Sequence, residues 1–101
     1  MSSEITFQVT SAKPPTIELS DAGLYIRFQL DVAVASTQIQ QVWPHIAVDL
    51  DSSGNVIGIE VVPAPPKFSI GSIPLIAQQA RVDKLPDYDP ADVQIANLAA
   101  A

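Results

Sequence analysis

Carboxylate and hydroxyl groups with the spacing of a calcium-binding loop lie in the middle of the chain. Four of them fall at positions 1, 3, 5 and 12 of the twelve-residue EF-hand loop: Asp49, Asp51, Ser53 and Glu60. Gly54 falls at position 6, where that loop turns sharply. An EF-hand needs a helix on each side to aim its ligands, and prolines before and after this segment prevent both helices. Calcium binding is therefore kept as an alternative hypothesis, and we predict no metal site.

The other groups that could take part in acid–base or nucleophilic chemistry are isolated from one another. His45 is the only histidine, and its place at the start of a strand is typical of an exposed histidine. Asp87 and Asp89 lie beside prolines, where they fit the start of a helix better than acid–base work. The chain has no cysteine, and it has neither a glycine-rich phosphate loop nor a nucleophile elbow. We therefore predict a protein that is not an enzyme, with no catalytic residue and no cofactor.

The acidic segment fits a β-hairpin better than a metal loop. Residues 45–62 alternate between apolar and polar side chains on both sides of a short polar linker, residues 52–55. Gly54 supplies the positive φ that such a tight turn requires. Asp49 then lies on the polar face of one arm, and Glu60 lies across from it or nearby on the other arm.

The same period of two predicts the remaining strands. Apolar residues occupy every even position from 24 to 34, which predicts the longest strand. A shorter alternation predicts a first strand over residues 5–9, and residues 17–19 add a short extended segment. Residues 39–42 form a short strand, and because Pro44 follows it closely we place it at an edge of the sheet or between strands.

These patterns predict one domain over residues 1–101, of the mainly β (α+β) class. Its parts are a small antiparallel β-meander of four or five strands over 5–62, a Pro-rich connector over 63–72, and a helical C-terminal segment over 73–101. Two short helices are expected in that last segment. The first runs from about Ile73 to Arg81 with Ser72 as its N-cap, and the second from Val93 to Leu98.

Composition narrows the classes of partner. A net charge of -6 and scattered basic residues argue against nucleic-acid binding. With 48 % hydrophobic residues but no apolar run long enough to span a bilayer, the chain is expected to fold without a membrane. The first residues lack the features of a signal peptide, so we expect a cytoplasmic protein. Its acidity serves solubility, or attracts a basic protein partner.

Residues 19–62 resemble a small prokaryotic family known as domain of unknown function 2283. The likeness rests on Leu24-Tyr-Ile and on the motif Asp-x-Asp-x-x-Gly-x-x-x-Gly-Ile-Glu, which runs from Asp49 to Glu60. The chain departs from the family at Ala22, where an aspartate is usual and Asp21 is displaced by one position. The resemblance implies a small antiparallel sheet and assigns no chemistry. It brings in one alternative function, that of an antitoxin-like partner of a basic protein.

A single-layer sheet needs a cover for its apolar face, and either the predicted helix from Ile73 or a second copy could supply it. Tyr25, expected on the outer face of the sheet, and Trp43 are the candidate interface residues, and Tyr88 is a further aromatic to watch. We therefore expect a protein-interaction module that self-associates through its sheet as a homodimer or larger assembly. The antitoxin-like partner and the calcium-binding module remain the alternatives.

Overall fold

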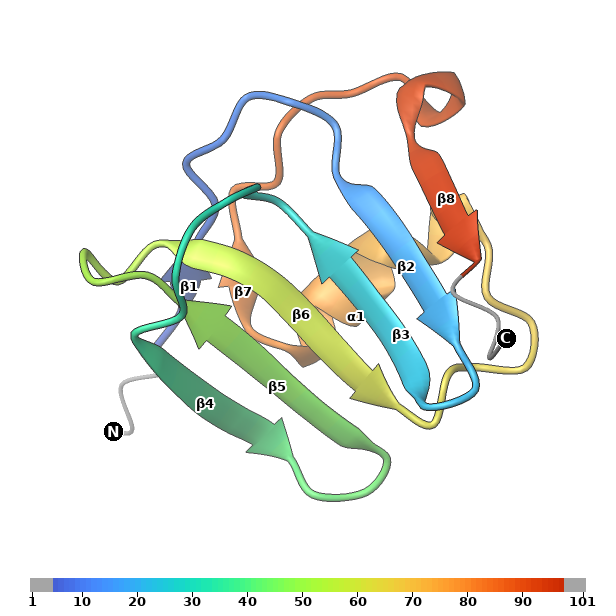
Figure 1. Ribbon diagram of the computed structural model, residues 1–101, viewed down its shortest axis with the longest axis horizontal. Coiled ribbons are helices and arrows are strands. Elements are labelled where there is room, and N and C mark those ends of the chain that lie inside the picture. Colours follow the sequence, from blue (N-terminus) through green and yellow to red (C-terminus); the bar gives the residue numbers. More distant parts are fainter. Residues whose placement is uncertain (1–4, 98–101) are drawn as a thin grey trace.

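The computed structural model describes residues 5–97, and a six-stranded mixed sheet forms its centre (Figure 1). The strand order is β4-β5-β6-β3-β2-β8, in which β8 runs parallel to β2 and all other neighbours are antiparallel. The strands are β2 (Thr16–Ser20), β3 (Gly23–Arg27), β4 (Ser36–Gln41), β5 (His45–Leu50), β6 (Val56–Val62) and β8 (Gln94–Asn97).

One face of this sheet is covered by elements that lie behind it in Figure 1. They are the two-stranded parallel sheet of β1 (Phe7–Gln8) and β7 (Val82–Asp83), the helix α1 (Ile73–Gln79), and the 3-10 turn η1 (Ile70–Ser72) before it. A second 3-10 turn, η2 (Pro90–Asp92), leads into β8 at the edge of the sheet. Alternate apolar side chains of β2, β3, β5 and β6 form a continuous core with the helix. The predicted helix is confirmed, although it ends at Gln79 and not at Arg81, and the side chain of Ser72 makes no capping hydrogen bond. The cover of the apolar face comes from the same chain.

The central hairpin is confirmed as β5 and β6. Gly54 takes a φ of +82° in the turn. The carboxylate of Asp51 accepts hydrogen bonds from the backbone N–H groups of Ser53 and Asn55, each at 2.9 Å. Gly54 and Asp51 therefore both favour this turn.

The C-terminal helix predicted at Val93 is wrong. Asp89 does cap a turn, since its carboxylate accepts a hydrogen bond from the N–H of Ala91 at 2.9 Å. That turn is only the short 3-10 turn η2 and does not continue into an α-helix. Val93 is then buried in the core, and β8 pairs with β2 as a parallel sixth strand. The predicted meander of four to five strands is therefore also wrong. The segment that forms β8 pairs with the open edge of β2, and this pairing outweighs the weak helical tendency of so short a segment. Leu98 lies outside the described residues.

The longest predicted strand stops early. The strand β3 ends at Arg27, and Asp31 takes a φ of +56°. Leu30 has 67 % of its surface exposed, although the alternation placed it in the core. The chain leaves the sheet here because it must pass the ends of β6 and β5 to reach the far edge, where β4 lies (Figure 1).

Three shorter predictions have mixed outcomes. The first strand is only Phe7–Gln8 long and pairs with β7, so its assignment to the main sheet over residues 5–9 is wrong. The extended residues 17–19 belong to the full strand β2. The strand predicted at 39–42 is confirmed as the edge strand β4, with bounds Ser36–Gln41.

Candidate functional site

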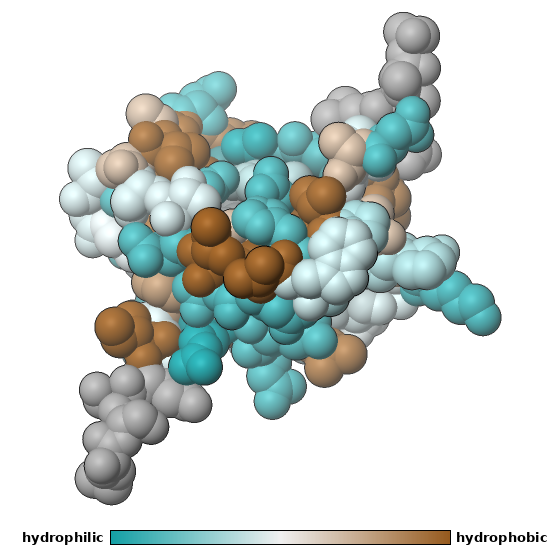
Figure 2. All heavy atoms as spheres, turned by 90° about the horizontal axis from the view of Figure 1, so that it is seen from below, coloured by the Kyte–Doolittle hydropathy of each residue, from teal (hydrophilic) through white to brown (hydrophobic). Residues whose placement is uncertain are grey.

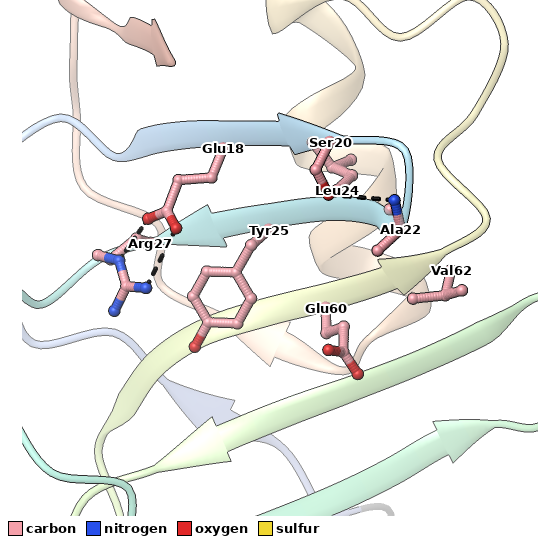
Figure 3. A pocket seen from close by; sticks show the side chains of 9 residues that line it. Glu18, Ser20, Ala22, Leu24, Tyr25, Arg27, Glu60 and Val62 are labelled. Carbon is pink, nitrogen blue, oxygen red and sulfur yellow. Dashed lines mark hydrogen bonds and ion pairs between the residues drawn. The ribbon is translucent and has the colours of Figure 1, made fainter. Parts of the chain in front are cut away.

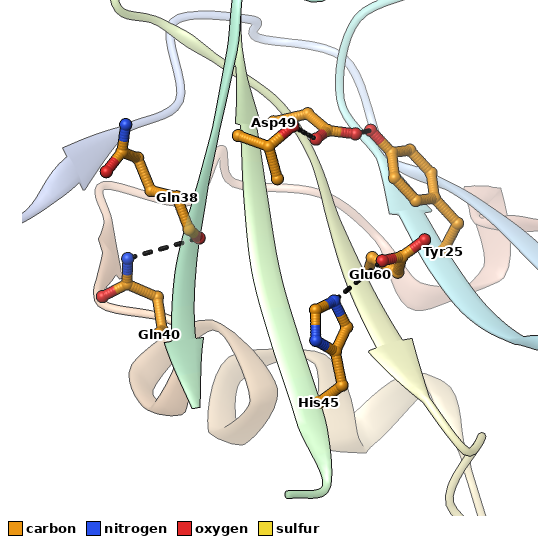
Figure 4. Close-up of polar contacts among 7 residues, drawn as sticks. Tyr25, Gln38, Gln40, His45, Asp49 and Glu60 are labelled. Atoms are coloured by element: carbon orange, nitrogen blue, oxygen red, sulfur yellow. Dashed lines mark hydrogen bonds and ion pairs between the residues drawn. The ribbon is translucent and has the colours of Figure 1, made fainter. Parts of the chain in front are cut away.

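The sheet has an open face, opposite α1, and on it polar side chains from neighbouring strands meet. The hydroxyl of Tyr25 donates to Asp49 Oδ2 at 2.8 Å, and that of Thr37 donates to Asp49 Oδ1 at 2.7 Å (Figure 4). The ring of Tyr25 crosses β6 at Gly58, where a Cβ atom would overlap it. Burial, and then the hydrogen bond to Asp49, raise the pKa of Tyr25 above its usual value, so its hydroxyl stays protonated. This chain of contacts ties β3 to β5 and β4.

A shallow hollow of about 230 Å³ lies beside Tyr25 on the same face (Figure 3). Arg27 Nε donates to Glu18 Oε2 at 2.5 Å, and its Nη2 to Oε1 at 3.3 Å. This bond to Glu18 raises the pKa of Arg27 further, and the guanidinium lies 4.8 Å from the centre of the Tyr25 ring. Glu60 lines the far side of the hollow and contacts His45, with Oε1 and Nε2 3.0 Å apart. The charged side chains that line the hollow therefore already have partners within the chain: Glu18 and Arg27 contact each other, and Glu60 contacts His45.

The four residues with calcium-loop spacing are spread over a hairpin. Asp49 lies on β5, Glu60 on β6, and Asp51 and Ser53 at the turn between them. Both oxygens of Asp49 accept hydrogen bonds from side chains, and Asp51 accepts from two backbone N–H groups and from the side chain of Gln29. Within residues 5–97 there is no group of three or more His, Cys, Asp or Glu side chains placed to hold a metal ion. The calcium hypothesis thus rests on the spacing alone.

The edge strand β4 and the turn that follows it form the second notable surface. Ile39 is 62 % exposed, Val42 83 % and Trp43 77 %. Figure 2 views the molecule from the side on which β4 lies and shows brown, apolar atoms gathered in the middle of this face. No Asp, Glu, Lys or Arg occurs between Asp31 and Asp49, so the whole edge is uncharged.

The two candidate interface residues have different surroundings. Tyr25 is half-buried and committed to contacts within the sheet, whereas Trp43 projects from the molecule beside β4. Tyr88 packs against the core, and its burial raises its pKa. The alternation of apolar and polar residues in the sequence did not identify Thr37 or Glu18 as members of the open-face network. Which side chains meet across strands depends on the order of the strands, which the alternation does not give. The run of uncharged residues that contains β4 is visible in the sequence, and it is a signal that identifies this edge strand as a candidate contact surface.

Comparisons with protein-family models, with curated proteins and with solved structures found no match. The resemblance to domain of unknown function 2283 therefore stays a prediction. Among the residues that the structure describes, none of the helices has the length and apolar character needed to cross a membrane.

Proposed function

We propose that this chain is a small non-enzymatic protein-interaction module that self-associates through its sheet, with the free edge at β4 as the contact surface. The observation that carries the proposal is a sheet edge that is uncharged along its length and exposed from Ser36 to Ile39. Natural edge strands are usually protected by charged residues, proline, a bulge or a covering element. The strand β4 has a bulge after Ile39 but contains neither a charge nor a proline, and within residues 5–97 it pairs with β5 alone.

The partner that fits an uncharged edge best is a second copy of this chain. Two molecules that each carry a net charge of -6 repel each other, and contact through the neutral segment keeps their carboxylates apart. A basic partner gains more from the acidic loops than from β4. The apolar cover is complete within one chain, so association at the edge adds to a folded monomer.

The polar groups of the open face support a role without catalysis. Glu18 is paired with Arg27, and Glu60 with His45. The raised pKa of Tyr25 keeps its hydroxyl a hydrogen-bond donor to Asp49. These contacts fasten neighbouring strands together and give the edge a rigid support.

A matched pair of variants tests the proposal. Ile39→Lys places a charge on β4, and Ile95→Lys places the same charge on β8, the opposite edge of the same sheet, where Ile95 is 45 % exposed. In sedimentation velocity up to about 1 mM protein, we expect the wild type and Ile95→Lys to gain mass with concentration and Ile39→Lys to stay monomeric. A wild type that stays monomeric, or an effect confined to Ile95→Lys, would refute contact through β4.

The two alternative functions give different results. An antitoxin-like protein captures a basic partner from a lysate and releases it at high salt, because screening weakens attraction between opposite charges. A calcium-binding module releases or absorbs heat in calorimetry when millimolar calcium is added. Neither result depends on Ile39.

A further inference from the structure

We infer that two copies of this chain pair their β4 strands antiparallel about a two-fold axis at Gln38, which sets Val34 of each copy beside Val42 of the other. This arrangement rests on the proposed function, because it specifies the partner and the register of the contact proposed there. An isologous contact of this kind uses one surface twice, so the surface has to be complementary to itself.

The hydrogen bonds of the sheet indicate which backbone groups point outward. Phe28 N–H donates to the carbonyl of Ile57 at 2.7 Å, one residue beyond the register pair Arg27 and Gly58. In an antiparallel sheet, such a bond between the next two residues shows that Arg27 and Gly58 form a pair that is not hydrogen-bonded. The N–H and C=O of Gly58 therefore point away from β3, toward β5.

The direction of the backbone N–H and C=O groups continues to alternate through β5 to the edge strand β4. Asp49, the partner of Gly58, points its backbone groups toward β6, so Val48 points toward β4 and bonds to its partner Gln38. The backbone groups of Thr37 and Ile39 consequently point away from the sheet. These two residues carry the N–H and C=O groups that are available to a second copy.

A two-fold axis at Gln38 uses these groups fully. It pairs Thr37 of one copy with Ile39 of the other, twice, and each pair exchanges two backbone hydrogen bonds. The side chains of Thr37 and Ile39 lie on the open face, so the exposed Ile39 packs on the Thr37 of the second copy.

The exposed valines agree with this axis. Val34 is 51 % exposed and Val42 83 % exposed, and both lie four residues from Gln38, on opposite sides. Val34 and Val42 flank the two ends of β4, so antiparallel pairing about Gln38 brings the Val34 end of each copy to the Val42 end of the other and removes apolar surface from water. The bulge between Ile39 and Gln41 limits the regular pairing to a few residues, so we expect an interface below the standard size and a dimer that dissociates on dilution.

Single-cysteine variants measure the register, because the natural chain has no cysteine. In this arrangement the two Gln38 residues form a pair that is not hydrogen-bonded, with Cα atoms about 4.5 Å apart, within the range of a disulfide. The two Thr37 residues, and the two Ile39 residues, are each offset by two positions along the strands, about 7 Å. Under mild oxidation, two thiols of Gln38→Cys lose two electrons and two protons to dissolved oxygen and form one S–S bond.

We expect Gln38→Cys to give covalent dimers faster than Thr37→Cys, Ile39→Cys and the exposed turn control Ser52→Cys, by about tenfold or more. A fastest reaction at position 37 or 39 would overturn the axis at Gln38 while leaving the proposed contact through β4 standing. Equal, slow reaction at all four positions together with a monomeric wild type would refute both.

A charge pair tests the contact between the valines. Val42→Asp should weaken the dimer by about tenfold or more, and the double variant Val34→Lys with Val42→Asp should recover most of that loss, since each lysine faces the other copy's aspartate. A double variant that dimerises no better than Val42→Asp alone would contradict the register, whatever the mass of the wild type.

Discussion

At the scale of single residues, the open face depends on a glycine and a tyrosine in contact across two strands. A Cβ at Gly58 would overlap the ring of Tyr25 at its outer end. That ring is held in place, since its hydroxyl is bonded to Asp49 and its face lies beneath the guanidinium of Arg27. A glycine within a strand usually marks such a close approach, and here the approaching group is an aromatic ring.

We predict that Gly58→Ala destabilises the protein by about 1–3 kcal/mol, because the ring has to leave its position and its hydrogen bond. In a Tyr25→Ala background the same substitution should cost much less. Urea unfolding of the two single variants and the double variant measures this coupling. Gly71→Ala is the matched control, since a Cβ at Gly71 meets only Ser69 Oγ at 3.8 Å. Equal costs of Gly58→Ala in both backgrounds would contradict the contact.

Asp51 makes the central turn dependent on pH. The backbone hydrogen bond from Asn55, and then the hydrogen bond from the side chain of Gln29, lower the pKa of Asp51, which means that the folded state favours its charged form. A lowered pKa contributes stability that is fully present above the unfolded value, near 3.8, and is lost as the pH falls through the folded value.

Asp51→Asn removes this titration but keeps an oxygen that can accept the turn's N–H groups. We predict that the wild type is the more stable protein at about pH 7 and that its advantage over Asp51→Asn shrinks toward about pH 3. Urea unfolding at both pH values measures the two differences. An advantage that is the same at both would show that the charge of Asp51 does not stabilise the turn.

At the scale of elements, the parts predicted well are those whose partners are close in sequence. The hairpin of β5 and β6 was predictable because its turn residues and its alternation agree over eighteen positions, residues 45–62. The helix α1 was predictable from the spacing of Ile73, Ile76 and Ala77, all of which are buried.

The strand β8 and the end of β3 were not predictable in this way. The strand β8 has its partner β2 more than seventy positions away, and a parallel pairing leaves no mark on the local pattern. The alternation after Phe28 continues through Val34, yet these residues cross the end of the sheet and lie exposed, because the position of β4 at the far edge decides their path. Of the candidate site, the exposed Trp43 lies beside the proposed contact surface, whereas the register of β4 came only from the structure.

The turn between β4 and β5 gives a spectroscopic test, since Trp43 is the only tryptophan. In the monomer it is exposed, so its emission should be that of a solvated indole and should be quenched readily by acrylamide. We predict a blue shift and reduced quenching as protein concentration rises, because Val42 and the adjacent Trp43 enter the contact. Ile39→Lys should lack this change, and the same change in that variant would place the contact elsewhere.

At the scale of the whole molecule, the distribution of charge matters more than its sum. The net charge is -6, but the acids are absent from the run of residues that contains β4. Salt reduces the repulsion between charges of the same sign, and it reduces the attraction between charges of opposite sign. Salt therefore acts in opposite directions on self-association and on capture of a basic partner.

We predict that the dimer becomes stronger as salt rises from about 50 mM to about 500 mM. Light scattering at fixed protein concentration follows this as a rise in mean mass. A mass that falls with salt would indicate that opposite charges hold the assembly together, and it would favour an acidic protein that binds a basic one.

The most direct measurement of the central claim, contact between copies through β4, is a dilution series of ¹H–¹⁵N NMR spectra with amide hydrogen exchange. On concentration, shifts should change along residues 34–43, and the amides of Thr37 and Ile39 should become protected from exchange. Those of Ser36 and Gln38 should change little in protection, since they already bond to β5. Changes confined to β8 or to the open face, or spectra independent of concentration, would contradict the account.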